Sequence, residues 1–552
     1  SSMSYPKKNF RLYTNQVDDT EVYDYQGNKV EDKLYAFKDN AQPVDVWCLK
    51  ADYAESSGTH NTGIARLWNK VMYDAVIDGE HKLRTKAQVA ALSNNYKYDV
   101  RTTVDGFPIN LFYKLDDDSE LVFIGKYNFN NDKSTESVYG FRDIPGFDNS
   151  KVECWEVLNN GDPIALFKTV DNFDKAWDTA FEGRYPDGNT EVSNLKNFCT
   201  WVTGSNGKLT SFKRDKWEHL DVYKVAAYYV YLIRFGAVDQ TVKNAMLTTE
   251  DGQHYFYINY DNDTVNGLVN TGNLEAPWDV DRNTKGVDGA YIYAGHECVL
   301  WNMLEQDDEF MNIVQKVDIA LYIAGLKYAD VIDMFDNKQA GAWSQRVYNY
   351  DATYKYLNPY TRNGVNNLFM LQGSRSTHRK FWLQRRFNLY DSKFVSGAFK
   401  SNVFEIKFIN DTPANQSFTI TAANKLYYGY GINELVTESG IELLNGKSHT
   451  FSTPRVLNLG DPVRIYGVTE LDAIDVSACA NRINQLSVSA NVNCTKFTKL
   501  ICGSTSNNNE VVSEISGIEK LVNLKTLDLT NYRGFTSLDL TGLFNIETLK
   551  IN

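Results

Sequence analysis

The sequence predicts an α+β domain in roughly its first 400 residues, followed by a small β module and a leucine-rich ladder. Apolar residues recur at helical spacing between about 200 and 390, and short alternating runs occur on either side of that region. An apolar triplet repeats near the C-terminus. Because 552 residues exceed what one core usually supports, we expect parts at 1–200, 201–399, 400–462 and 463–552.

Composition excludes several classes of protein. A hydrophobic content of 43% is enough for packed cores, and the net charge of −13 with scattered basic residues argues against nucleic acid as a partner. The longest apolar run, Val225 to Ile233, is too short to cross a membrane, so no membrane insertion is expected. Seven cysteines without a C-x-x-C pair indicate buried, reduced thiols.

The first 200 residues mix strands and loops. Strands are predicted at Phe10–Tyr13, Val44–Leu49 and Leu121–Tyr127. An amphipathic helix is predicted between Ser56 and Tyr73, because its apolar residues lie at helical spacing on one wide face: Ile64, Leu67, Trp68, Val71 and Met72.

A mainly helical region follows. We expect one long helix from Asp215, as its cap, to Gly236, then a strand at Tyr255–Asn259. Further helices are expected from about 297 to 334 and from 375 to 389.

Strands at Phe404–Ile409 and Ser417–Thr421 begin a β module, expected to be sandwich-like. The ladder follows, and its apolar triplets have the spacing L-x-x-L-x-L: 471/474/476, 483/486/488, 497/500/502, 524/527/529, 535/538/540 and 546/549/551. Each triplet is expected to place one short strand on a shared sheet, as in a leucine-rich-repeat-like solenoid. Since no polar cap follows the last triplet, we expect further rungs beyond Asn552.

One constellation carries potential chemistry. Asp239 is followed five residues later by Asn244, and a strand then leads to Asp261 and Asp263. Phosphoryl transfer uses a carboxylate to accept a hydroxyl proton, an amide oxygen on Mg²⁺ and a second carboxylate on the metal. The spacing is therefore kinase-like, although a solvated loop would also produce it.

This series of a long helix, an Asp…Asn loop, an aromatic strand and a D-x-D turn resembles the signature of the CotH-type kinases, an atypical kinase family. The opening residues, from Ser1 to Leu12, resemble that family's N-terminal strand motif, and the resemblance covers roughly residues 1–390. It implies a bilobal kinase-like fold, with 1–200 as the N-lobe-like part and 201–399 as the C-lobe-like part.

The resemblance also implies roles for individual residues. Asp239 would be the catalytic carboxylate, with Asn244, Asp261 and Asp263 as metal ligands and ATP and Mg²⁺ as cofactors. The phosphate-facing lysine would be Lys7 or Lys8, with Lys50 as a competitor, and sequence does not choose among them.

Three departures favour an inactive site. No glycine-rich loop is visible, Ala237-Val238 stand where kinases have His-Arg, and no glycine follows Asp261.

Two functions are consistent with these features. The architecture resembles tail-region proteins of tailed bacteriophages, which predicts an oligomeric structural protein of the virion, assembled in the bacterial cytoplasm. Its partners would be other virion proteins, copies of itself and a host-surface component, and its kinase-like fold would be inactive. The alternative is an active ATP- and Mg²⁺-dependent protein Ser/Thr kinase of the CotH type.

Overall fold

The computed structural model describes most of residues 7–551. The larger stretches outside the description are 159–172, 269–275, 336–349, 354–360, 392–401, 433–440, 453–461 and 505–513; residues 1–6, 552 and shorter breaks are also outside it. The chain divides into two compact units, Ser1–Phe387 and Asn388–Asn552. The predicted mixture of helices and sheets is confirmed. Within the described residues, none of the helices combines the length and apolar character needed to cross a bilayer.

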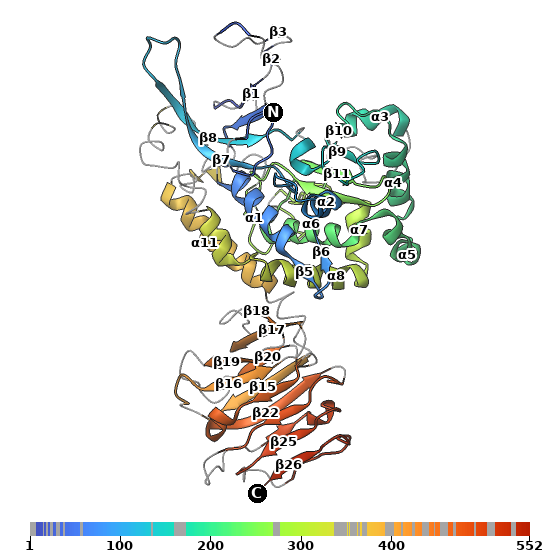
Figure 1. Cartoon of the computed structure of the whole chain (residues 1–552), viewed down its shortest axis with the longest axis vertical. Coiled ribbons are helices and arrows are strands. Elements are labelled where there is room, and N and C mark those ends of the chain that lie inside the picture. Colours follow the sequence, from blue (N-terminus) through green and yellow to red (C-terminus); the bar gives the residue numbers. More distant parts are fainter. Residues whose placement is uncertain are drawn as a thin grey trace. The chain divides into compact units, whose positions relative to one another are not determined.

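The first sheet of unit 1 is antiparallel and has the order β1-β4-β8-β7 (Figure 1). Its strands are β1 (Phe10–Tyr13), β4 (Val46–Lys50), β7 (Gly106–Tyr113) and β8 (Val122–Asn131). β4 lies between β1 and β8, so its last residue, Lys50, is held at a defined place on a three-strand core of this sheet.

Helix α1 (His60–Asp74) follows β4 in the chain and matches the predicted amphipathic helix. Its apolar face is fully buried, with Ile64 and Val71 at 0% exposure. The carboxylate of Glu55 accepts the backbone N–H groups of Thr59 and His60 at 2.9 and 3.2 Å. Because these N–H groups have no partner within the helix, the carboxylate fixes where α1 begins.

The second sheet of unit 1 has the order β10-β9-β11-β12. The strands are β9 (Glu153–Val157), β10 (Phe181–Tyr185), β11 (Ala245–Thr249) and β12 (Tyr255–Asn259), the last at its predicted bounds. β11 and β12 form a hairpin in which Ala245 pairs with Asn259. The segments just before β11 and just after β12 therefore leave the same end of the hairpin.

The prediction of a single long helix from Asp215 is wrong, because the structure has two helices here: α5 (Leu209–His219) and α6 (Val222–Phe235). Leu220 is extended and bridges to Tyr255, and the backbone N–H of Asp221 donates to the carbonyl of Tyr255 at 3.0 Å. Pairing with β12 thus interrupts the helical pattern. Asp221, rather than Asp215, caps the second helix by accepting the N–H of Lys224, and Gly236 ends it with a left-handed φ of 56°.

Unit 1 also contains further helices and three pairs of two-residue strands. The helices are α2 (Lys86–Ser93), α3 (Phe173–Ala180), α4 (Ser193–Gly204), α7 (Val299–Glu305), α8 (Asp308–Ile323), α9 (Tyr328–Asp333) and α11 (Gln372–Tyr390), which runs into unit 2. Two-residue strands form the pairs β2 (Gln16–Val17) with β3 (Thr20–Glu21), β5 (Val76–Ile77) with β6 (His81–Lys82), and β13 (Thr361–Arg362) with β14 (Val365–Asn366).

Unit 2 contains two six-stranded sheets, of order β18-β17-β20-β15-β22-β24 and β19-β16-β21-β23-β25-β26. The first comprises β15 (Asn402–Phe408), β17 (Lys425–Ile432), β18 (Ile441–Asn445), β20 (Pro462–Tyr466), β22 (Ile483–Ala490) and β24 (Glu514–Ser516). The second comprises β16 (Ser417–Thr421), β19 (Ser448–Ser452), β21 (Ala473–Asp475), β23 (Lys499–Ile501), β25 (Thr526–Leu529) and β26 (Thr548–Ile551). The segments 400–462 and 463–552, expected as separate modules, contribute strands to both sheets.

The predicted ladder is present in part, and not on one sheet. Four of the six triplets place Ile474, Leu500, Leu527 and Leu549 in parallel register on β21, β23, β25 and β26. The triplet at 483/486/488 lies in the other sheet, where Leu486 pairs in parallel register with Ile515 of β24. The triplet at 535/538/540 forms no strand at residues 537–540, and Phe535 lies outside the described residues. Triplets on both sheets contribute to a single buried apolar core.

All seven cysteines are buried and none is in a disulfide, as predicted.

Candidate functional site

Lys50 and Asp261 meet in the candidate site although they are far apart in sequence. The Lys50 ammonium, at the end of β4, lies 3.6 Å from the carboxylate of Asp261, just beyond β12. It also donates to the Tyr260 hydroxyl at 3.2 Å. Burial opposes the charge of Lys50, but Asp261 and Tyr260 outweigh it, so the pKa of Lys50 is raised well above its usual value. Lys50 therefore stays charged.

The turn that carries Asp261 is held from several sides. The amide of Asn61, in the first turn of α1, lies 3.5 Å from the Asp261 carboxylate, and its oxygen accepts the backbone N–H of Asn262 at 3.2 Å. Tyr231 of α6 donates to the side chain of Asn262 at 2.6 Å, and Gln240 donates to the backbone carbonyl of Asp261 at 2.7 Å. The turn is thus fixed by α1, α6 and the 237–244 loop.

Asp52 is a second carboxylate at this site that the sequence did not single out. Asn61 donates to it at 3.3 Å, and Asn128 of β8 donates to its other oxygen. Burial raises its pKa to about 6; Lys126 opposes this and Glu55 adds to it. Asp52 and Asp261 both adopt left-handed backbone conformations, with φ of 48° and 55°. Such conformations in residues other than glycine are often found at functional sites.

The acidic groups of this region affect one another electrostatically. Burial, followed by the charges of Asp261 and Asp52, raises the pKa of Asp263 well above that of an ordinary aspartate, and Asp239 adds to the increase. Burial raises the pKa of Asp239, Lys243 opposes the rise, and Asp261 adds to it. Lys50 favours the ionised forms of Asp52 and Asp263.

The other predicted site residues lie less centrally. Asn244 is half-buried with a left-handed φ of 51° directly before β11, and no hydrogen bond joins it to Asp261 in the described part of the chain. Lys7 is buried, donates to the carbonyl of Lys126 and lies 4.8 Å from the Tyr127 ring centre. Lys8 is exposed. Among the described residues, Lys50 is the candidate lysine that forms an ion pair with Asp261.

The donor set can be compared with what a divalent cation needs. Among the described residues, no three histidine, cysteine, aspartate or glutamate side chains are arranged to hold a metal ion unaided. Mg²⁺ in nucleotide sites is commonly held by only one or two carboxylates together with phosphate oxygens. Burial raises the pKa of Asp263 and the charges of Asp261 and Asp52 add to the rise, so a bound cation would favour its ionised form. Asp261 and Asp263 therefore fit a cation that arrives with phosphate.

Sequence reasoning missed Asp52 and Asn61 because nothing in their local patterns distinguishes them. Asp52 lies two residues beyond Lys50, and Asn61 falls inside the predicted helix at its N-terminal end.

In comparisons with known proteins, no family model and no curated sequence matches this chain. The functional assignment is therefore built on the residues and contacts described above.

Proposed function

We propose that unit 1 is a kinase-like domain of the CotH type that binds ATP with Mg²⁺ and transfers a phosphoryl group to a hydroxyl. In this proposal, the β1-β4-β8-β7 sheet with α1 corresponds to the smaller lobe of a bilobal kinase-like fold. The second sheet with its helices corresponds to the larger lobe. The observation that carries the proposal is the 3.6 Å ion pair between Lys50 and Asp261, which come from these two parts.

Each residue has a role that follows from its chemistry. Lys50, kept charged by its surroundings, would bind phosphate oxygens as a point charge. Asp261 and Asp263, with Asn244 nearby in the hairpin, would hold the cation. Bound Mg²⁺ would neutralise charge on the transferred phosphoryl group. Asn61 holds the turn that presents Asp261.

Asp239 would accept the proton of the attacking hydroxyl. It is buried, with a pKa raised by burial, and a carboxylate with a raised pKa is a stronger base than one in water. The ammonium of Lys243, 3.9 Å away, partly compensates the negative charge of Asp239. No His-Arg pair precedes Asp239. Instead, the side chain of Gln240 links this loop to the Asp261 turn by donating to the Asp261 carbonyl.

The test is Mg²⁺-dependent binding of ATP by the full chain, measured by calorimetry. Lys50→Ala and Asp261→Ala should each weaken binding by about tenfold or more, since each removes a charge-assisted contact. Lys8→Ala is the control, because Lys8 is an exposed lysine just before β1, the strand that pairs with β4. The Lys8→Ala variant should bind ATP with wild-type affinity. Absence of ATP binding by the wild-type chain would overturn the proposal.

A second candidate is a structural role in a tailed-bacteriophage particle. It is favoured by exposed apolar side chains around the β7–β8 hairpin: Leu115 and Leu121 are 81% and 68% exposed. Large exposed apolar side chains are suited to an interface with another chain, either a copy of this one or another virion protein. In this reading the ladder is a leucine-rich-repeat-like solenoid and the kinase-like site is inactive.

Two measurements test that candidate. Mass spectrometry of purified phage particles should find the chain in stoichiometric amounts. Sedimentation of the full chain should show an oligomer that Leu121→Asp dissociates. A monomeric wild-type chain that is absent from particles would contradict the structural role.

A further inference from the structure

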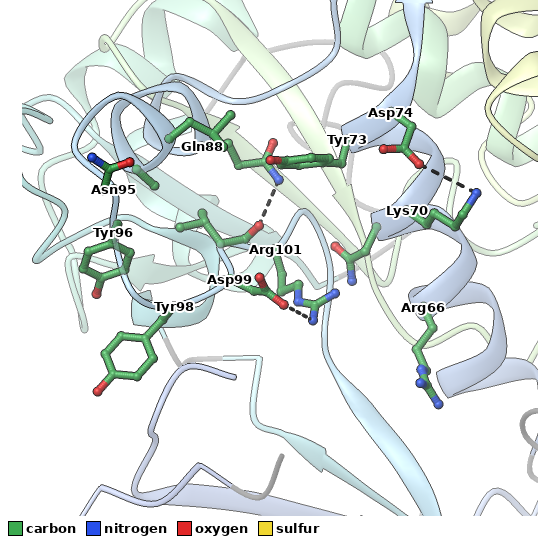
Figure 2. A pocket seen from close by; sticks show the side chains of 14 residues that line it. Arg66, Lys70, Tyr73, Asp74, Gln88, Asn95, Tyr96, Tyr98, Asp99 and Arg101 are labelled. Atoms are coloured by element: carbon green, nitrogen blue, oxygen red, sulfur yellow. Dashed lines mark hydrogen bonds and ion pairs between the residues drawn. The ribbon is translucent and has the colours of Figure 1, made fainter. Parts of the chain in front are cut away.

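A separate cavity of ≈ 630 Å³ lies in unit 1 between α1, α2 and the loop 95–101 (Figure 2). None of its lining residues belongs to the Lys50–Asp261 site. Its size falls within the range of cavities that bind small molecules, about 300–1,000 Å³.

One wall is a polar stripe on α1. Arg66, Asn69, Lys70 and Tyr73 follow at helical spacing, so they lie on one face, opposite the buried apolar residues. Lys70 donates to the carbonyl of Ala324 at 2.9 Å and pairs with Asp74 at 3.7 Å. Arg66 is half-buried, and in the described part of the chain it makes no hydrogen bond or ion pair. Its guanidinium is available to a ligand.

A second guanidinium enters from the loop. Arg101 lies between the two walls in Figure 2. One of its nitrogens donates to Asp99 at 2.8 Å and lies 3.7 Å from Asp105. Its Nε atom is buried without a hydrogen-bond partner among the described residues. A buried donor left unsatisfied is costly, and an acceptor in the cavity would satisfy it.

The opposite wall is aromatic. Tyr96 and Tyr98 are both half-buried, with ring centres 5.7 Å apart in an edge-on arrangement. Figure 2 shows them across the cavity from Arg66 and Lys70. Tyrosine rings offer apolar faces to a ring-shaped ligand while their hydroxyls remain able to donate and accept.

We propose that this cavity binds a sugar acid, that is, a hydroxylated ring bearing one carboxylate. Planar guanidinium groups match a carboxylate geometrically, so Arg66 and Arg101 would bind that group. The walls carry three cationic and two anionic side chains, a net charge that suits a single negative charge. Asp74 and Asp99 can accept hydrogen bonds from ring hydroxyls, and they disfavour a doubly charged phosphate. The proposal does not depend on the kinase-like assignment.

The experiment uses the full chain and glucuronate as the probe, with binding followed by ligand-observed NMR and calorimetry. Glucose tests the need for the carboxylate, and glucose 1-phosphate tests discrimination against a doubly charged anion. Arg66→Ala should weaken glucuronate binding at least about tenfold, since it removes a charge-assisted contact from a side chain with no structural partner. Arg214→Ala is the matched control, because it removes one positive charge from a 76% exposed side chain of α5.

The outcomes separate cleanly. Glucuronate binding that exceeds glucose binding, falls in Arg66→Ala and persists in Arg214→Ala supports the proposal. Equal binding of glucose, stronger binding of glucose 1-phosphate, or an equal loss in both variants overturns it. No measurable binding of glucuronate at millimolar concentration also overturns it. Melting curves of both variants establish that neither has unfolded.

Discussion

Asp52 is a carboxyl group buried among other acids, and its burial has a measurable consequence for stability. Its pKa is about 6 in the folded chain against an ordinary value of 3.8, so the folded state binds this proton more tightly than the unfolded state does. Stability from this group is therefore fully present below about pH 4 and is lost as pH rises through about 6.

We expect Asp52→Asn to be more stable than wild type at pH 7, by about 1–3 kcal/mol, because it removes a buried charge. Asparagine also tolerates the left-handed backbone at this position. Denaturant unfolding at pH 4 and pH 7 measures the difference, which should vanish at the lower pH. The exposed Asp178→Asn on α3 should show no such dependence. A variant less stable than wild type at pH 7 would show that the hydrogen bonds to Asn61 and Asn128 outweigh the buried charge.

Asn61 joins α1 to both acidic segments, so its loss should act on binding as well as on folding. We expect Asn61→Ala to cost about 1–3 kcal/mol of stability and to weaken Mg²⁺-dependent ATP binding about tenfold, since the Asp261 turn loses its contact with α1.

Asn69→Ala is the control for this variant. Asn69 lies on the same helix, is equally buried, and hydrogen-bonds Thr102 at 2.7 Å and Val104 at 3.4 Å rather than the Asp261 turn. It should lose similar stability in chemical denaturation but keep wild-type ATP affinity in calorimetry. Equal loss of affinity in both variants would assign Asn61 a purely structural role.

Among the secondary-structure elements, the ladder has leucine at one buried and one exposed position of the same register. Leu500 on β23 and Leu549 on β26 occupy the same register position, two strands apart, but Leu500 is fully buried whereas Leu549 is 44% exposed. The edge strand has a neighbour on one side only.

We expect Leu500→Ala to destabilise unit 2 by about 2–5 kcal/mol and Leu549→Ala by less than about 1 kcal/mol. The first opens a cavity in the core, while the second removes a side chain already half in water. Thermal unfolding of both variants checks this difference. Equal losses would mean that Leu549 is buried in solution.

For the whole molecule, the division into two compact units predicts two unfolding transitions in calorimetry. ATP with Mg²⁺ should raise only the transition of unit 1, because a ligand stabilises the unit that binds it. Leu500→Ala should lower only the transition of unit 2, which identifies each transition. A single transition that shifts as a whole in both experiments would contradict independent units.

Sequence periodicity determined many elements of this protein. The strands Tyr255–Asn259 and Ser417–Thr421, the buried face of α1 and the positions of the ladder triplets follow from the spacing of apolar residues. Such spacing reports which side of an element faces a core, and it depends only on neighbours along the chain.

Only the tertiary structure decided which groups meet. It paired Lys50 with Asp261 and brought Asp52 and Asn61 to the same turn, across some two hundred residues of sequence. It also broke the long helix at Leu220, through pairing with β12, and distributed successive triplets over two sheets. These outcomes depend on contacts between distant segments, which local residue spacing does not encode.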